Sequence, residues 1–253
     1  MERSSTSFYF QTRQGIFGYS FPPQTWIPQR RGRNSLQERN NIIKEIYQHL
    51  LRFYGPQGWW PGETRLEIIV GAILTQNVSW KNVEKSIERI KASGFMDMDT
   101  LISMDDEVLH DFIRSTGYYR QKAGRLKELL KFIKENYGNI ENMVFDTNLR
   151  EKLLAIKGIG KETADSILLY ALDLPYFVVD AYTFRIFRRI GIIEESNKVK
   201  YEDIREMVEK SLGKNVNDLK EFHALLVALG KDHCKKVPVC EGCPLYSICQ
   251  RKI

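Results

Sequence analysis

The sequence has no apolar run as long as the roughly 18 residues that a membrane-spanning helix needs. Its first five residues, Met1-Glu-Arg-Ser-Ser, lack the apolar core of a signal peptide. No segment shows sustained two-residue alternation of apolar and polar side chains, the pattern of half-buried strands. These absences argue against a membrane protein, a secreted protein and a β-rich fold, and we expect an intracellular, all-α protein.

Cysteine is scarce, and all four cysteines lie within the last twenty residues, as Cys234, Cys240, Cys243 and Cys249. In a reducing compartment, such crowding indicates a metal centre more readily than two disulfides. Four thiolates on a short loop suit either tetrahedral coordination of zinc or a [4Fe-4S] cube. The spacing alone does not choose between these two groups.

The composition permits a large core and favours an acidic partner. Hydrophobic residues make up 43% of the 253 residues, which is enough for one domain or two interlocked lobes. The net charge of +6 and a pI near 9.0 favour a polyanion, because Lys and Arg neutralise phosphates. Many proteins without a nucleic-acid role are equally basic, so the charge alone does not identify the partner.

From Leu36 onward, apolar residues recur at three- and four-residue spacing, which predicts helices almost throughout. Residues 1–33 show no such period and carry many aromatic and basic side chains, so we expect a poorly ordered arm there. Glycines are expected to end several helices, at Gly138, Gly191, Gly213 and Gly230. The predicted helices cover residues 36–54, then segments opening at Thr64 and Ser79, then about 105–115, 119–137, 149–156, 161–172, 181–190, 200–212 and 217–229.

The most informative segment is Leu153-Leu-Ala-Ile-Lys-Gly-Ile-Gly-Lys-Glu-Thr-Ala-Asp165. Gly158 and Gly160, placed between two amphipathic runs, predict a tight hairpin of two helices. The second helix then starts with exposed backbone N–H groups, which can bind one phosphate of a nucleic acid. Asp180 follows an apolar approach, eighteen residues after Glu162. It can cap the helix that begins at Ala181, and this role is compatible with catalysis.

Together these features resemble the helix-hairpin-helix, Gly/Pro, Asp (HhH-GPD) superfamily of base-excision DNA glycosylases, and endonuclease III most of all in layout, over about residues 58–253. The resemblance implies an all-α, two-lobe fold with a C-terminal iron-sulfur cluster loop, and a monomer that binds double-stranded DNA with a damaged base in the cytoplasm or nucleoid. The implied parts are the arm 1–33, a helix at 34–57 that packs with the cluster lobe, a helical barrel lobe at 58–150, and a hairpin and cluster lobe at 151–253.

The resemblance also implies roles for individual residues. Asp180 acts in cleavage of the N-glycosidic bond, where a carboxylate stabilises the oxocarbenium character of the sugar and can orient or deprotonate water. The cysteines hold a [4Fe-4S] cluster, although the first gap is one residue shorter than is usual in the family. Gln76 fills the space of the flipped nucleotide, and Tyr118 is a second wedge opposite the lesion. Backbone contacts fall to Lys157, Gly158, Ile159, Gly160, Lys161, Lys235 and Lys236.

Glu162 departs from the pattern of the bifunctional members, which carry a lysine here to form a Schiff base with the sugar. A carboxylate cannot form an imine. Lys161 is adjacent, but one residue along a helix turns a side chain by about 100°, so it should face the DNA backbone or solvent. We therefore expect a monofunctional enzyme. Glu162 either helps to position water or is only a favourable acid in a first helical turn, and the sequence favours the second.

Aromatic residues indicate the base pocket. Trp59, Trp60 and Pro61 precede the segment that carries Gln76, and Trp80 follows it. This arrangement resembles the 3-methyladenine DNA glycosylases of the endonuclease III type, in which such residues stack on the base. Aromatic faces bind best to bases made cationic by alkylation. The alternative is that these tryptophans are lobe core.

The sequence thus predicts a monofunctional DNA N-glycosylase for an alkylated purine such as 3-methyladenine. One alternative is an endonuclease III-like glycosylase for oxidised or mismatched pyrimidines, with or without lyase activity. A second is a non-catalytic hairpin protein that only binds DNA.

Overall fold

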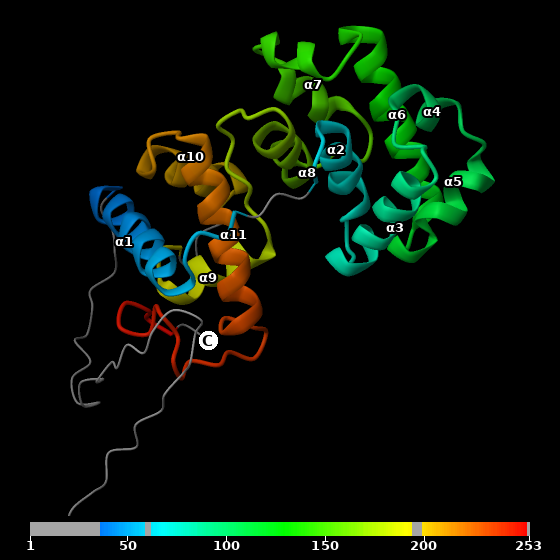
Figure 1. Ribbon diagram of the computed structural model, residues 1–253. Coiled ribbons are helices and arrows are strands. Elements are labelled where there is room, and N and C mark those ends of the chain that lie inside the picture. The colour runs from blue at the N-terminus through cyan, green and yellow to red at the C-terminus, as the bar shows by residue number, and fades with distance from the viewer. Residues whose placement is uncertain (1–35, 59–61, 194–198, 252–253) are drawn as a thin grey trace, which may run out of the picture. The chain divides into compact units, whose positions relative to one another are not determined.

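Helices make up all the regular structure in the residues that the computed structural model describes, which are 36–58, 62–193 and 199–251, and this confirms the all-α prediction (Figure 1). These residues belong to one compact unit, Gly32–Ile253. Within them, no helix is long and apolar enough to cross a membrane. The α-helices are α1 (Leu36–Tyr54), α2 (Arg65–Leu74), α3 (Trp80–Ala92), α4 (Met98–Ser103), α5 (Asp106–Ile113), α6 (Tyr119–Tyr137), α7 (Leu149–Ala155), α8 (Lys161–Ser166), α9 (Ala181–Ile190), α10 (Tyr201–Ser211) and α11 (Val216–Asp232).

The departures from the predicted helices are short. Helix α4 and the 3-10 helices η1 (Arg114–Thr116) and η2 (Glu141–Phe145) have one or two turns each, too few for a helical period to show in the sequence. The helix predicted at 161–172 is α8 followed by a π-helical segment, η3 (Ile167–Ala171). Such π-helical turns widen a helix locally and are frequent at functional sites.

Gly230 does not end the last helix, so that expectation was wrong. Helix α11 continues to Asp232. A Cβ atom at Gly230 would lie 2.1 Å from Cδ1 of Tyr182, whose ring comes from α9. The glycine is therefore needed for the close packing of α9 against α11, and a packing requirement of this kind leaves no mark in the local sequence.

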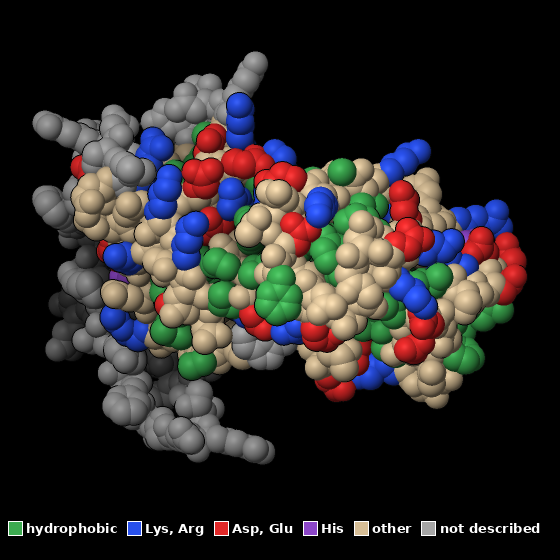
Figure 2. Space-filling view, turned by 90° about the horizontal axis from the view of Figure 1, so that it is seen from above, with side chains coloured by type: hydrophobic (Ala, Val, Ile, Leu, Met, Phe, Trp, Pro, Cys, Tyr) green, Lys and Arg blue, Asp and Glu red, His purple; other side chains and the backbone are tan. Residues whose placement is uncertain are grey.

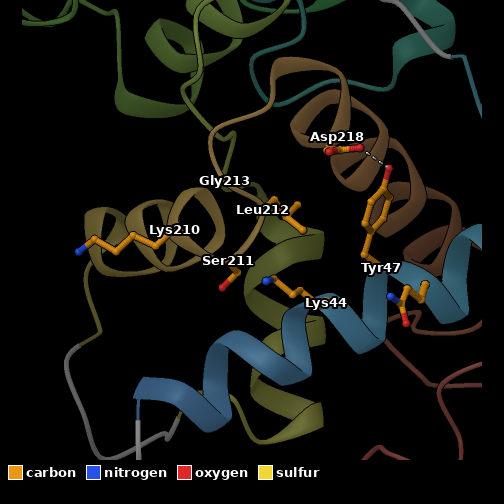
Figure 3. Close-up of a pocket in the computed structure, with 8 residues that line it drawn as sticks. Lys44, Tyr47, Lys210, Ser211, Leu212, Gly213 and Asp218 are labelled. Carbon is orange, nitrogen blue, oxygen red and sulfur yellow. Dashed lines mark hydrogen bonds between the residues drawn. The ribbon is translucent and has the colours of Figure 1, made fainter.

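Helix α1 packs against α10 and α11, which lie far away in the sequence (Figure 1). Its apolar face is fully buried at Ile43, Ile46 and Leu50. Beside this contact, the Tyr47 hydroxyl donates to Oδ1 of Asp218 at 3.0 Å (Figure 3). A pocket of about 360 Å³ opens here, lined by Lys44, Tyr47, Gln48, Lys210, Ser211, Leu212, Gly213 and Asp218. None of the predicted site residues lines it.

Helix α2 packs against four other elements, α3, α6, α8 and η3. Its end is held by a buried lysine of α6. The Lys122 ammonium donates to the carbonyl oxygens of Leu74, at 2.9 Å, and Thr116, at 2.6 Å. Burial, with help from Arg125, lowers the pKa of Lys122 to about 8. Lys122 therefore joins the end of α2 to the end of η1, two residues before Tyr118. The predicted lobe boundaries, at residues 58 and 151, stay a prediction.

Candidate active site

The glycine pair forms the turn between α7 and α8. Gly158 has a φ of +87°, in the left-handed region that favours glycine, and Gly160 is the N-cap of α8. A Cβ atom at Gly158 would also lie 2.3 Å from Nε of Arg125, a residue of α6. Ile159, between the glycines, is buried and anchors the turn in the core. The first turn of α8 starts at Lys161 and carries Glu162.

A buried ion pair fixes the orientation of α8. The Arg150 guanidinium on α7 donates to both carboxylate oxygens of Asp165 on α8, at 2.6 and 3.0 Å. Asp165 has no exposed side-chain surface. At the start of α8, the Lys161 ammonium donates to Glu202 of α10 at 2.7 Å. These contacts join α7, α8 and α10, and they direct the Lys161 side chain toward α10.

Asp180 is the N-cap of α9, as its position before Ala181 predicts. Its Oδ1 accepts hydrogen bonds from the Thr183 backbone N–H, at 2.7 Å, and from the Thr183 hydroxyl, at 2.8 Å. Its Oδ2 lies 3.6 Å from Nε2 of His223. The side chain is 13% exposed, so it is largely desolvated and still reachable from solvent. Burial alone would raise the pKa of Asp180, but the His223 and Thr183 interactions outweigh it and lower the pKa.

The pKa of Glu162, on α8, is shifted in the opposite direction from that of Asp180. The pKa of its carboxyl group is raised by the surrounding protein and by the negative charge of Asp180, and the effect of His223 opposes this only in part. The residue itself is exposed. A pair of carboxyl groups whose pKa values are moved apart is the arrangement in which one group stays ionised while the other can exchange a proton.

Sequence reasoning missed two residues behind Asp180, Tyr170 and His223. Tyr170 belongs to η3 and His223 to α11, and both are buried. The Tyr170 hydroxyl and Nδ1 of His223 are 2.6 Å apart. The only local signal is a histidine on the apolar face of α11, and the tertiary packing of α11 against η3 and α9 gives that histidine its neighbours.

The structure places Gln76 against the hairpin. Its amide N–H₂ donates to the Gly158 carbonyl and to the Thr163 hydroxyl, both at 3.1 Å. Its amide oxygen accepts from Arg125 at 2.6 Å. The loop that follows α2 is thereby joined to α6 and to the hairpin.

Tyr118 and Trp80 lie in different surroundings. Tyr118 is 71% exposed and has a φ of +46°, an unusual backbone conformation for a bulky residue. Trp80 opens α3, and its ring lies 3.3 Å from the place of a Cβ atom at Gly71 on α2, so part of the indole is packed between helices. Trp59, Trp60 and Pro61 lie outside the described residues.

Comparison with known proteins decides the family. A family model described as "HhH-GPD superfamily base excision DNA repair protein" matches residues 70–214, more than half of the chain. The chain belongs to the HhH-GPD superfamily. A Methanocaldococcus jannaschii protein named "Putative DNA repair glycosylase MJ1434" is 49% identical over 85% of this chain and 99% of its own length.

Two further similarities cover most of this HhH-GPD chain. Endonuclease III of Sulfolobus acidocaldarius is 31% identical over 75% of this chain and 84% of its own length. The crystal structure of H. pylori 3-methyladenine DNA glycosylase bound to 1,N6-ethenoadenine is 30% identical, with a TM-score of 0.66, over 76% of this chain and 97% of that chain. The chain is thus a DNA repair glycosylase of the endonuclease III type, which confirms the resemblance and the enzyme class and removes the non-catalytic alternative.

The cysteines of this HhH-GPD chain follow α11 and lie beside α9. Burial raises the pKa of Cys243 to about 11, and the thiols of Cys234, Cys240 and Cys249 add to this effect. An Arg189 N–H approaches Sγ of Cys234 at 3.4 Å. In the described chain, no set of three or more His, Cys, Asp or Glu side chains converges as the ligands of a single metal ion would.

Figure 2 shows no separate basic patch on the face that it displays. On the face seen in Figure 2, Lys and Arg side chains are interspersed with Asp and Glu. Lys157 is exposed at the hairpin, and Lys235 and Lys236 are exposed on the cysteine loop. The carbonyl oxygens of Lys235 and Lys236 accept from the Arg189 guanidinium at 2.6 and 2.9 Å, so the backbone of this loop is held against α9.

Proposed function

We propose that the protein is a monofunctional DNA glycosylase, active as a monomer, that hydrolyses the N-glycosidic bond of a flipped damaged base and leaves an abasic site. The observation that carries the proposal is the pair of carboxyl groups at the hairpin and the start of α9. Glu162 occupies the position where the resemblance implies a lysine in the nicking members, and desolvation, with the negative charge of Asp180, raises its pKa. An enzyme with two carboxyl groups here can direct water at the sugar but cannot form an imine with it.

In the proposed reaction, the base departs with the electron pair of the glycosidic bond, and the sugar gains positive charge. The ionised Asp180, kept so by its hydrogen bonds, stabilises this charge. Water adds to the sugar carbon, and its proton passes to the Glu162 carboxylate. The raised pKa of Glu162 makes it the better proton acceptor of the pair, and this favours the water-positioning role over that of a simple first-turn acid.

The neighbouring lysines support the absence of a covalent step. The Lys161 ammonium is paired with Glu202 on α10. The Lys122 ammonium is buried between the carbonyl oxygens of Leu74 and Thr116. Both amines are thus engaged by groups of the protein.

DNA binding is proposed to use the hairpin and the two wedges. The backbone of the turn at Gly158, Ile159 and Gly160, with the exposed Lys157, contacts phosphates on the damaged strand. The Ile159 N–H donates to the Ile156 carbonyl oxygen at 3.0 Å, so the N–H groups of Gly158 and Gly160 are the proposed phosphate donors. On DNA binding, the Lys161 ammonium leaves Glu202 and binds a phosphate instead. Lys235 and Lys236 contact the duplex from the cysteine loop. Tyr118, exposed and in a left-handed conformation, enters the stack opposite the lesion. Gln76 enters from the other side after it leaves its partners on the hairpin.

For the substrate, we propose an alkylated purine such as 3-methyladenine. The 30% identity to an H. pylori 3-methyladenine DNA glycosylase supports this choice. Trp59, Trp60, Pro61 and Trp80 would form the aromatic pocket, because aromatic faces bind cationic alkylated bases more strongly than neutral ones.

A second candidate is an oxidised or mismatched pyrimidine. It is favoured by the 31% identity to endonuclease III of Sulfolobus acidocaldarius over three quarters of the chain. The partial packing of Trp80 against Gly71 also leaves less of that indole for a flipped base. The two candidates differ in whether a neutral base is released as readily as a cationic one.

The deciding experiment measures base release from duplexes with a single 3-methyladenine, 7-methylguanine, uracil, thymine glycol or G·T mismatch, with and without borohydride. We expect release of the alkylated purines, strand cleavage only after alkali treatment, and no covalent adduct. An adduct trapped by borohydride would contradict the monofunctional mechanism. Release of pyrimidines alone would rule out the alkylated purine and favour the oxidised or mismatched pyrimidine as the substrate. A Glu162→Lys variant is the matched probe for whether an amine at this position restores trapping.

We further propose that Cys234, Cys240, Cys243 and Cys249 hold a [4Fe-4S] cluster. The donor set fits, since four thiols follow α11 on one short loop and N–H groups of Arg189 and Arg251 approach the sulfur atoms of Cys234 and Cys249. A cube distributes its four thiolates over four iron corners, so they need not converge on a single point. The cluster, when bound, would stabilise the loop that carries Lys235 and Lys236.

Iron and sulfide analysis of the anaerobically purified protein tests the cluster. We expect about four iron atoms per chain and loss of most of them in Cys240→Ser, because a cube of this type takes four thiolates. A stoichiometric content of zinc without sulfide would contradict the proposal and would assign the four thiols to a zinc site instead.

A further inference from the structure

A tyrosine and a histidine, both buried, lie in line behind Asp180. The Tyr170 hydroxyl is 2.6 Å from Nδ1 of His223, and Nε2 of the same ring is 3.6 Å from Oδ2 of Asp180. The three side chains come from η3, α11 and the start of α9. They connect the packed core to the carboxylate on which the proposed reaction depends.

The neighbours of the imidazole determine where its proton lies. If Tyr170 donates to Nδ1, the neutral ring carries its proton on Nε2, which faces Asp180. If Nδ1 instead donates to Tyr170, a neutral ring has its lone pair on Nε2, and this lone pair would face the carboxylate of Asp180 and be repelled by it. This arrangement is favourable only when the ring is a cation with a proton on both nitrogens. In both favourable states, Nε2 carries a proton toward Oδ2 of Asp180.

The two carboxylate oxygens of Asp180 thus have different partners. Oδ1 accepts from the N–H and hydroxyl of Thr183 within α9. We propose that His223 is a positioning residue for Asp180, whose Nε2–H orients Oδ2 and keeps the carboxylate ionised, and that Tyr170 places the proton on Nε2. This inference rests on the proposed function, because it takes Asp180 to be the charge that stabilises the sugar.

The arrangement assigns different work to the two carboxyl groups. A carboxylate that accepts several hydrogen bonds is a weak base, so Asp180 is suited to stabilise a cation and poorly suited to take a proton from water. The other ionisable groups that act on this cluster are Glu162 of α8 and Glu221 of α11, both acidic. Against these negative charges, the interaction with His223 is the largest of those that keep Asp180 ionised, and the two hydrogen bonds from Thr183 add to it.

A pH profile of base release distinguishes positioning from simple packing. In the proposed reaction both carboxyl groups must be ionised, Glu162 to accept the proton and Asp180 to stabilise the sugar. Because the pKa of Glu162 is raised and that of Asp180 is lowered, the part of the acid limb at lower pH follows Asp180. His223→Phe removes the N–H, so we expect that limb to move to higher pH by about one unit or more, with the loss of rate greatest under acidic conditions. His223→Gln, whose amide can donate to the same oxygen, should restore most of the acid limb. A uniform loss of rate at every pH, the same in both variants, would overturn the proposal.

Tyr170→Phe tests the second link. Without the hydroxyl, the imidazole is no longer held in one state, and a smaller move of the acid limb in the same direction is expected. Tyr137→Phe is the matched control, because it removes a comparable hydroxyl, bonded to Asp146 at 2.7 Å, far along the sequence on α6. Equal profiles for the two tyrosine variants would remove Tyr170 from the proposal.

A direct titration separates this inference from the proposed function. The side-chain carboxyl carbon of Asp180, labelled with ¹³C and assigned with Asp180→Asn, reports its ionisation by NMR without any turnover. We expect a higher pKa for Asp180 in His223→Phe than in the unmodified protein. An unchanged titration would refute the positioning role even if base release is observed. A raised pKa would support it even if the substrate assignment fails.

Discussion

Asp180→Asn is expected to lower the rate of base release by about 10²–10⁴-fold, the range typical for loss of a charge or proton-transfer group at a reaction centre. Asparagine is an equally good N-cap, so the start of α9 should keep its hydrogen bonds to Thr183. The amide has nearly the shape of the carboxylate but no charge to stabilise the sugar. The rate should be measured under single-turnover conditions, with enzyme in excess over a duplex that the unmodified protein processes.

Two controls accompany that measurement. The variant should unfold at nearly the same temperature as the unmodified protein, and it should bind a duplex with an abasic-site analogue with nearly the same affinity. A rate within about threefold of the unmodified protein, well below the effect expected for such a group, would mean that Asp180 serves only as a cap.

Arg150→Met is expected to lower the free energy of unfolding by about 3–5 kcal/mol, because it leaves the buried Asp165 without its cation. The pKa of Asp165 is already raised by burial, against the opposing effect of Arg150. Removing Arg150 moves the pKa of Asp165 still further above its value in the unfolded chain. The loss of unfolding free energy in the variant is therefore largest at high pH, where Asp165 would be ionised without a partner. The loss should become smaller as the pH falls and Asp165 binds a proton. Urea unfolding at pH 8 and pH 5 tests both the size and the sign.

The double variant Arg150→Met/Asp165→Leu should be more stable than Arg150→Met alone, since no uncompensated charge is left. Lys210→Met is the matched control, because it removes one partner of an exposed pair with Glu206, with both side chains at least half exposed. Exposed pairs of this kind contribute about 0–1 kcal/mol, so little change is expected. If Arg150→Met and Lys210→Met lose the same amount, the ion pair between α7 and α8 is not a main support of the hairpin.

The sequence predicted those parts of the molecule that are encoded locally. Helix α1, the turn at Gly158 and Gly160, and the N-cap at Asp180 each depend on residues within a few positions of one another. The apolar period, the glycine pair and the cap residue are all visible in a short window. The family also followed from the order of these local motifs, and the family model confirms it.

What escaped prediction depends on contacts between distant segments. His223 lies 43 positions after Asp180 and reaches it only because α11 packs against α9. Lys122 would be taken for a surface residue from its type, yet its ammonium is buried between two carbonyl oxygens. Gly230 is of the residue type that usually ends a helix, but here it makes room for the ring of Tyr182. In each case tertiary packing overrides the usual preference of the residue.

The contact between Gly158 and Arg125 has a consequence for how this chain can change over time. The glycine is required twice, once by the left-handed turn and once by the arginine side chain that occupies the space of a Cβ atom. A descendant that had lost its affinity for DNA would still be under selection to keep Gly158 for as long as the turn kept this conformation. The hairpin glycine alone is thus a poor marker of retained activity, and Glu162, an exposed residue to which neither requirement applies, is the better record of what the protein still does.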